Sequence, residues 1–253
     1  MDSQPSSLVL AGTTVSDSMR NYSKTLIEAA SLADREPQHL LLFCAVPDGA
    51  GAMRMVASFA QYLVKTGYNV TVAHGRSTAQ SAELPDSANR ILAKLAQAGV
   101  KVVGLEGFRK RYSPELNRKL CDFVKENNVH GLIGFHPLDI KYALRVAGQC
   151  QRVCIVSTQN KHVFWGNPIV RRLKRFVYSQ LIRRHATRVI CTSQPLFDEV
   201  VDFGVAKHRC CIVPNGIPVD KYSPTHELDI QNVRAKLGVA AGDQLLMLSL
   251  IHI

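Results

Sequence analysis

The sequence predicts an α/β fold with a doubly wound, mostly parallel sheet, and two observations lead to this prediction. Seven short apolar runs of strand length recur between residues 39 and 214, and helical patterns separate them. The first run is continuously apolar, as expected for a parallel strand that is covered on both faces. Strands and helices that alternate in this way form a Rossmann-like sheet with helices on both sides.

The first strand–helix–strand unit begins at His39. "HLLLFCAV" (39–46) has strand length, and "PDGAGAM" (47–53) is a turn that contains two glycines. Residues 54–67 form a helical pattern that stops at Gly67, and "NVTVAHG" (69–75) is the next strand. The apolar face of the helix carries Val56, Phe59, Ala60, Leu63 and Val64. Its crossover should be right-handed.

The same alternation continues along the chain. Further strands are expected at residues 100–105, 130–136, 152–158, 187–193 and 209–214. Further helices are expected at residues 87–98, 113–127, 138–149, 168–185 and 195–203. The polar residues 1–37 precede the sheet and contain one helical pattern near 18–33, with Ser16 or Asp17 placed to cap it.

Length and composition are those of an ordinary soluble globular protein. The 253 residues suffice for one large α/β domain, or for one domain and a fragment, and 46% are hydrophobic while 20% are charged. No apolar run approaches the roughly 18–20 residues that a membrane span requires. The N-terminus has no basic segment before its short apolar patch, so it is not typical of a signal peptide. We therefore expect a cytoplasmic protein.

The seven cysteines favour buried, reduced thiols over a metal site. Five of them lie in or beside apolar strand-like runs, no CxxC occurs, and the Cys150–Cys154 spacing lacks a second ligand pair. A zinc site is the alternative, but we expect no metal.

Polar groups at the carboxyl ends of the strands are the first candidates for function, because ligands bind there in doubly wound sheets. The segments to consider are Asp48–Arg54, His74–Arg76, His136–Pro137, Thr158–His162 and Ser193–Gln194.

The loop after the first strand is the strongest anion-site candidate. Its glycines let backbone N–H groups approach an anion at the helix N-terminus. The candidate binding residues are Gly49, Ala50, Gly51, Ala52 and Arg54. A dinucleotide fingerprint is disfavoured, because Arg54 stands where GxGxxG needs a third glycine and the second strand does not end in an acid. A turn that binds nothing is the alternative.

The ends of later strands add His136, Thr158, Asn160 and Ser193 as candidate binding residues. Pro137 holds the chain extended after His136. The stretch "STQNKH" (157–162) offers amide donors and acceptors that suit sugar hydroxyls. The alternatives are that the polar side chains of residues 157–162 are simply solvated and that His136 has a structural role.

The stretch "VICTSQPLFDEVVDFGVAKHRCCIVPNGIPVDKYSP" (189–224) resembles the end of the N-terminal domain of family 4 glycosyltransferases of the GT-B fold. The matching residues are Ser193, Gly204-Val205, Pro214-Asn215-Gly216-Ile217, Asp220, Tyr222 and Pro224. The resemblance extends back to about His39, where "PDGAGAMR" stands in for the family's glycine-glycine loop.

The resemblance implies the N-terminal, acceptor-side half of a GT-B fold. Residues 1–37 would be an extension, 38–220 the Rossmann-like domain, and 221–253 a linker with the truncated start of the donor-binding domain. Pro214, Asn215 and Gly216 would form the joint between the halves, because prolines stiffen it and Asn-Gly permits a tight turn. The family's groups that hold the sugar nucleotide in the second half are absent, so we expect an inactive fragment.

By the same resemblance, the complete enzyme would be a retaining hexosyltransferase. It would take a nucleoside diphosphate sugar as donor and a sugar or lipid-linked hydroxyl as acceptor, without a cofactor. Many family members have a Thr-x-His arrangement near the reacting centre, but this sequence reads Thr158-Gln159-Asn160, with His162 two residues later. The catalytic residue therefore stays unknown, with His136, Asn160 and His162 as weak candidates.

One segment makes the chain basic. Residues 140–197 contain no Asp or Glu but eleven Lys and Arg, while the rest of the chain balances; the net charge is +11. In the helix at 168–185 we expect one apolar face, formed by Ile169, Leu173, Phe176, Val177, Gln180 and Leu181, to pack on the core. The bases outside that face are Arg171, Arg172, Lys174, Arg175, Arg183 and Arg184.

These bases have three interpretations. In the first interpretation, the bases form a solvated face. In the second, they dock on an anionic membrane surface, which would make the protein peripheral at the inner membrane face. Nucleic acid is not expected, because only Tyr178 lies among the bases and no stacking platform exists. The competing function class is a non-catalytic Rossmann-like binding or adaptor domain that docks through this face.

Overall fold

In the computed structural model, the chain divides into two compact units, Met1–Gly216 and Ile217–Ile253. The structure describes residues 38–49, 51–76, 84–106, 108, 113–159, 166–216, 227–240 and 243–244. The expected helix near 18–33, the candidates Ala50, Asn160 and His162, and most of the segment after Gly216 lie outside the described residues.

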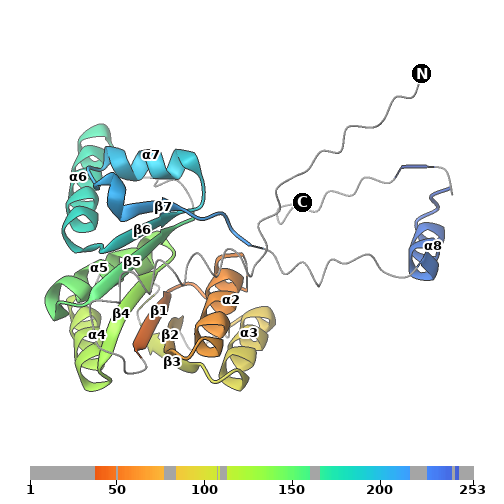
Figure 1. Cartoon of the computed structure of the whole chain (residues 1–253), viewed down its shortest axis with the longest axis horizontal. Coiled ribbons are helices and arrows are strands. Elements are labelled where there is room, and N and C mark those ends of the chain that lie inside the picture. Colours follow the sequence, from red (N-terminus) through yellow and green to blue (C-terminus); the bar gives the residue numbers. More distant parts are fainter. Residues whose placement is uncertain are drawn as a thin grey trace. The chain divides into compact units, whose positions relative to one another are not determined.

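A seven-stranded sheet with the order β3-β2-β1-β4-β5-β6-β7 forms the centre of the first unit (Figure 1). Every pairing is parallel, so the expected "mostly parallel" sheet is entirely parallel among the described strands. The strands are β1 (His39–Cys44), β2 (Asn69–Arg76), β3 (Lys101–Glu106), β4 (Val129–Gly134), β5 (Val153–Thr158), β6 (Arg188–Cys191) and β7 (Cys210–Ile212).

Helices connect the strands in the expected alternation. They are α2 (Gly51–Lys65), α3 (Asp86–Gln97), α4 (Pro114–Glu126), α5 (Pro137–Cys150), α6 (Pro168–His185), α7 (Gln194–Asp202) and the short 3₁₀ helix η1 (Lys207–Arg209). Most boundaries differ from expectation by one or two residues, and two of the differences have a clear cause. α2 starts three residues early, since Met53 already packs into the core, and β4 ends at Gly134, since His136 caps the next helix.

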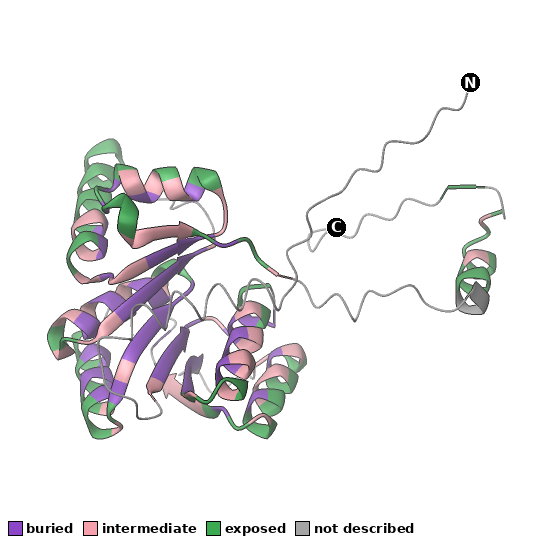
Figure 2. Cartoon of the chain, in the orientation of Figure 1, coloured by how far each residue is buried: buried purple, intermediate pink, exposed green. Residues whose placement is uncertain are grey.

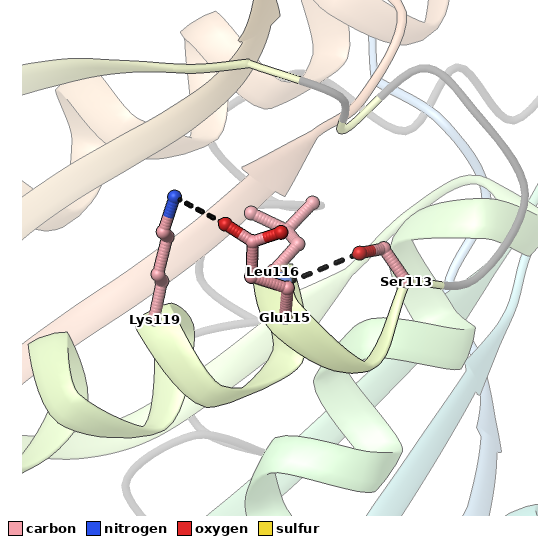
Figure 3. Close-up of polar contacts among 4 residues, drawn as sticks. All are labelled: Ser113, Glu115, Leu116 and Lys119. Carbon is pink, nitrogen blue, oxygen red and sulfur yellow. Dashed lines mark hydrogen bonds and ion pairs between the residues drawn. The ribbon is translucent and has the colours of Figure 1, made fainter.

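The start of α4 shows how local chemistry fixes a helix end (Figure 3). Ser113 is the N-cap residue, and its Oγ accepts a hydrogen bond from the backbone N–H of Leu116 at 3.2 Å. Pro114 occupies the first helical position, where no N–H is needed. Glu115 and Lys119, one turn apart, form an exposed ion pair of 2.8 Å, which contributes little to stability.

The sheet buries both faces, and each face has its own core (Figures 1 and 2). On one face, Leu41 and Phe43 of β1 pack with residues of α4, α5, α6 and α7. On the other, Leu40 and Leu42 pack with residues of α2 and α3. Neighbouring residues of β1 thus point to opposite cores, which explains why the strand is continuously apolar.

The orientation expected for α6 is wrong. Ile169, Leu173, Phe176 and Val177, four residues of the expected core face, are exposed, while Tyr178 and Ile182 are the buried residues of the helix. α6 packs against α5, and a Cβ at Gly148 of α5 would lie 2.5 Å from the ring of His185. The side that carries Tyr178, Ile182 and His185 therefore faces the protein.

None of the helices in the described ranges is long and apolar enough to cross a membrane. All seven cysteines fall within the described residues as free thiols; Cys44, Cys121, Cys154 and Cys191 are buried. In the second unit, α8 (Glu227–Lys236) is followed by a turn in which Arg234 Nη2 donates to the carbonyls of Ala240 and Asp243.

Candidate functional site

The carboxyl ends of β1 and β4 lie side by side at the centre of the sheet. From β1 the chain proceeds outward to β2 and β3, whereas from β4 it proceeds in the opposite direction to β5, β6 and β7. The sheet therefore changes winding direction between β1 and β4. In doubly wound sheets, the loops that diverge at such a point form a crevice that binds ligands.

A buried carboxylate ties the two loops of this crevice together. Asp139, in the first turn of α5, accepts a hydrogen bond on Oδ1 from the N–H of Ala45 at 2.7 Å and on Oδ2 from the N–H of His136 at 3.1 Å. Ala45 follows β1 and His136 follows β4, so one side chain fixes both strand ends. Burial raises the pKa of Asp139 to about 7, and the two N–H donors oppose this rise.

Close packing holds α5 in the same place. Gly134, the last residue of β4, lies so near α5 that a Cβ there would be 2.8 Å from the backbone N and Cα of Ile140. Further along α5, the ring of Tyr142 makes an edge contact with Phe108, which in turn makes one with Phe43 of β1. The position of α5 relative to β1 and β4 is thus set by backbone contact and by buried rings.

The N-terminus of α2 forms the β1 side of the crevice. Gly49 has a φ of +75°, and a Cβ there would come within 2.2 Å of Ser87 Oγ, so this position requires glycine. Arg54 Nε donates to the carbonyl of Gly49 at 3.2 Å and closes the turn. Gly51 and Ala52 are exposed at the start of the helix, and a Cβ at Gly51 would contact nothing within 4 Å. As the first residues of a helix, they have N–H groups without a partner within the helix.

His136 forms the β4 side of the crevice. It is the N-cap of α5, with its ring exposed, and Nδ1 accepts a long hydrogen bond of 3.5 Å from the N–H of Leu138. Partial desolvation lowers the pKa of His136, and the carboxylate of Asp48 across the crevice opposes the shift. The lowered pKa favours the neutral ring, and because Nδ1 accepts a hydrogen bond, the neutral ring carries its proton on Nε2.

The ends of β5 and β6 contribute less than expected. The Thr158 side chain is buried and donates from Oγ1 to the carbonyl of Ile190 at 3.3 Å, so its hydroxyl joins two strands. A binding role of Thr158 stays a prediction. Ser193 is partly exposed at the N-cap of α7 and makes no capping hydrogen bond, so its hydroxyl stays a candidate.

Gly51 and Ala52 thus follow β1, and His136 follows the neighbouring strand β4, at the carboxyl edge of the sheet, while Gly49 and Arg54 shape the turn before α2. Sequence reasoning missed Asp139, although a signal was present. His136 followed by Pro137 and, three residues after the histidine, by an acid is the pattern of a capping box, in which the acid reaches back to the N-cap N–H.

The joint predicted from the sequence follows the edge strand β7. The last ladder bond runs from the N–H of Val213 to the carbonyl of Cys191 at 2.8 Å, after which Pro214 and Asn215 are exposed and Gly216 is partly exposed. Across the ranges that the structure describes, no cluster of three or more His, Cys, Asp or Glu side chains is arranged to hold a metal ion.

Comparison with known families identifies one match. The model of Glycosyltransferase Family 4 matches residues 49–221, a span that runs from the loop after β1 to the segment after β7. A comparison with curated protein sequences gives no match.

Two solved structures share the fold. Anabaena Alr3699/HepE in complex with UDP is 16% identical, with a TM-score of 0.58, and the match covers 79% of this chain and 50% of that chain. A glycosyltransferase from Rickettsia africae ESF-5 is 10% identical, with a TM-score of 0.59, and the match covers 82% and 51%. The chain spans about half the length of these proteins and has the Rossmann-like fold of one half of a GT-B enzyme.

Proposed function

The chain belongs to glycosyltransferase family 4, and we propose that it forms the acceptor-side half of an enzyme that transfers a sugar from a nucleoside diphosphate sugar to a hydroxyl group. The observation that carries this proposal is the exposed N-terminus of α2, which follows β1 at the point where the sheet changes winding direction. The solved Anabaena HepE structures hold UDP, UDP-glucose or UDP with glucose, which supports a donor of this type.

The chemistry follows from what these groups supply. When the sugar leaves its donor, negative charge develops on the diphosphate, and the N–H groups of Gly51 and Ala52 stabilise that charge at the positive end of a helix. Because Asp139 fixes both loops beforehand, these donors need not reorganise during the reaction. His136 donates from Nε2 to an oxygen of the bound sugar or acceptor.

The finer assignments rest on family membership. We propose a hexosyl donor, retention of configuration at the transferred carbon, and a lipid-linked or sugar acceptor reached at the inner face of a membrane. The groups that hold the nucleotide would come from a second, donor-binding half. Residues 1–253 alone therefore turn over nucleotide sugars more slowly than about 1 s⁻¹, a rate ordinary for complete enzymes.

Calorimetric titration of the chain with inorganic pyrophosphate tests the anion site. Gly51→Pro removes one N–H at the first helical position, where proline is tolerated, and Gly51→Ala keeps that N–H and adds a Cβ that contacts nothing. We expect Gly51→Pro to weaken pyrophosphate binding about tenfold, as for the loss of one charge-assisted hydrogen bond, and Gly51→Ala to bind as the parent does.

Two results would count against the proposal. Equal binding by the parent and Gly51→Pro would remove the α2 N-terminus from the donor site. Turnover of UDP-glucose by residues 1–253 at the rate of a complete enzyme would show that no second half is needed.

A further inference from the structure

Two cysteine side chains meet between the neighbouring helices α4 and α5 (Figure 1). Cys121 belongs to α4, and Cys150 is the last residue of α5. The thiol of Cys150 donates a weak hydrogen bond to the backbone carbonyl of Cys121 at 3.9 Å. Both residues line a cavity of about 350 Å³ that is formed by residues of α4 and α5. The two residues are therefore neighbours in the fold, although they lie 29 positions apart in the sequence.

An amide network holds the Cys121 side of the cavity. Oε1 of Gln149 accepts hydrogen bonds from Cys121 Sγ at 3.0 Å and from Nδ2 of the buried Asn117 at 2.6 Å. If Cys121 lost its proton to a new covalent bond, Gln149 would still accept from Asn117. The polar network between α4 and α5 can therefore persist without the thiol proton of Cys121.

The two thiols differ in their access to solvent. Cys150 is partly exposed, whereas Cys121 is buried. Burial and, after it, a hydrogen bond with the Cys150 thiol raise the pKa of Cys121. A small reagent that enters the cavity should therefore react first at Cys150, and Cys121 should follow more slowly.

We propose that Cys121 and Cys150 form a site of oxidative modification, at which hydrogen peroxide converts the two thiols into a disulfide that joins α4 to α5. In the first step, the Cys150 thiolate attacks one peroxide oxygen. The S–O bond forms, the O–O bond breaks, and hydroxide leaves and takes up the proton that the thiol had released. Cys150 is then a sulfenic acid.

In the second step, the sulfur of Cys121 attacks the sulfur of Cys150. The S–S bond forms, the S–O bond breaks, and the departing hydroxide takes the Cys121 proton to form water. The two thiols together lose two electrons, and the peroxide is reduced to two molecules of water.

The disulfide would close a loop that contains β4, His136 and Asp139. This is the segment that forms the β4 side of the crevice. A cross-link lowers the conformational entropy of the unfolded chain, so oxidation should stabilise this segment against unfolding. The modification does not depend on sugar transfer.

Peptide mapping of residues 1–253 tests the proposal. The folded chain is treated with hydrogen peroxide, the remaining thiols are blocked with N-ethylmaleimide, and the chain is digested with trypsin without a reductant. Trypsin cuts after Lys and Arg, so it releases Cys121 in residues 120–125 and Cys150 in residues 146–152. We expect mass spectrometry to find these two peptides linked, and dithiothreitol to separate them.

Thermal unfolding measures the effect on stability. Oxidation should raise the melting temperature of the parent chain by roughly 5–15 °C, and dithiothreitol should reverse the rise. Cys150→Ser should show neither the linked peptides nor the rise. Cys210→Ser is the matched control, because Cys210 is also partly buried but lies on β7, and this variant should behave as the parent does.

The order of the two steps has its own readout. In Cys121→Ala no second thiol meets the sulfenic acid, so dimedone added during oxidation should label Cys150. Circular dichroism of the reduced variants establishes that each one keeps its fold.

Four results would overturn the proposal. Cys150 is oxidised to a sulfinic acid in the parent without linkage to Cys121, the linkage joins two chains into a dimer, or oxidised Cys150→Ser still shows the rise in melting temperature. The fourth is a yield of the Cys121–Cys150 linkage that is as high in urea as in the folded chain, because the native contact would then not direct the reaction.

Discussion

Replacing Asp139 with asparagine keeps the shape of the side chain and removes one acceptor from the crevice. Oδ1 of the new amide still accepts from Ala45, but its NH₂ group then faces the N–H of His136, which was bound at 3.1 Å. A buried donor left without an acceptor costs about 1–3 kcal/mol. We expect Asp139→Asn to lower the free energy of unfolding by about 2 kcal/mol, or the melting temperature by about 4–8 °C for a chain of this size.

The size of this loss depends on pH. Burial raises the pKa of folded Asp139 to about 7 from the ordinary 3.8, so the unfolded chain releases this proton first as the pH rises. The parent therefore loses stability progressively between these two pH values, whereas asparagine does not titrate. The difference in free energy of unfolding between the parent and Asp139→Asn should become smaller as the pH rises to about 7 and stay constant above that pH.

Urea unfolding followed by circular dichroism, at about pH 6 and about pH 8, measures both effects. Asp122→Asn on the exposed side of α4 is the matched control and should change the free energy of unfolding by less than about 0.5 kcal/mol. If Asp139→Asn behaves like this control, or if its gap to the parent widens with pH, the carboxylate does not hold the two loops together.

Two further predictions concern the α2 turn and the cysteines. Gly49→Ala should lower the free energy of unfolding by about 3 kcal/mol in urea, because Ala disfavours a φ of +75° and its Cβ would overlap Ser87. The double variant with Ser87→Gly should lose less stability than the sum of the two single variants, and strict additivity would contradict this contact. In a titration with Ellman's reagent, at most the three partly buried cysteines, Cys150, Cys210 and Cys211, should react in the native chain, because burial raises the pKa of the other four thiols; all seven should react in urea. Rapid reaction of Cys154 or Cys191 in the native chain would contradict the packing of β5 and β6.

Much of the sheet could be predicted from sequence because its strands are buried on both faces. After its first residue, the run "HLLLFC" has only apolar side chains, which is typical of a parallel strand that is covered by helices on both faces. The candidate residues at the strand ends followed from the same topology, and Gly51, Ala52 and His136 do lie at the carboxyl edge of the sheet.

The orientation of α6 could not be predicted in the same way. Its strongest apolar pattern, Ile169, Leu173 and Phe176, shows that one side of the helix is apolar but not what lies against that side. The side that packs on the protein carries Tyr178, Ile182 and His185, a weaker pattern of the same spacing, and Gly148 of α5 permits its approach. That choice depends on a contact between distant segments.

The hydrogen bond of Thr158 could not be predicted for a related reason. A hydroxyl at a strand end suits a crevice, but in a parallel sheet it can also reach the neighbouring strand, as Oγ1 does to Ile190. The role of Asp139 was harder to predict, because the residue lies in a helical pattern and one of its two partners, Ala45, is 94 residues away in the sequence.

Backbone amide NMR of residues 1–253 during titration with inorganic pyrophosphate tests the central claim most directly, because it locates the anion residue by residue. The account predicts the largest shift changes at Gly51, Ala52 and the residues around His136. Largest changes at the bases of α6, or none at the start of α2, would contradict a donor crevice between β1 and β4.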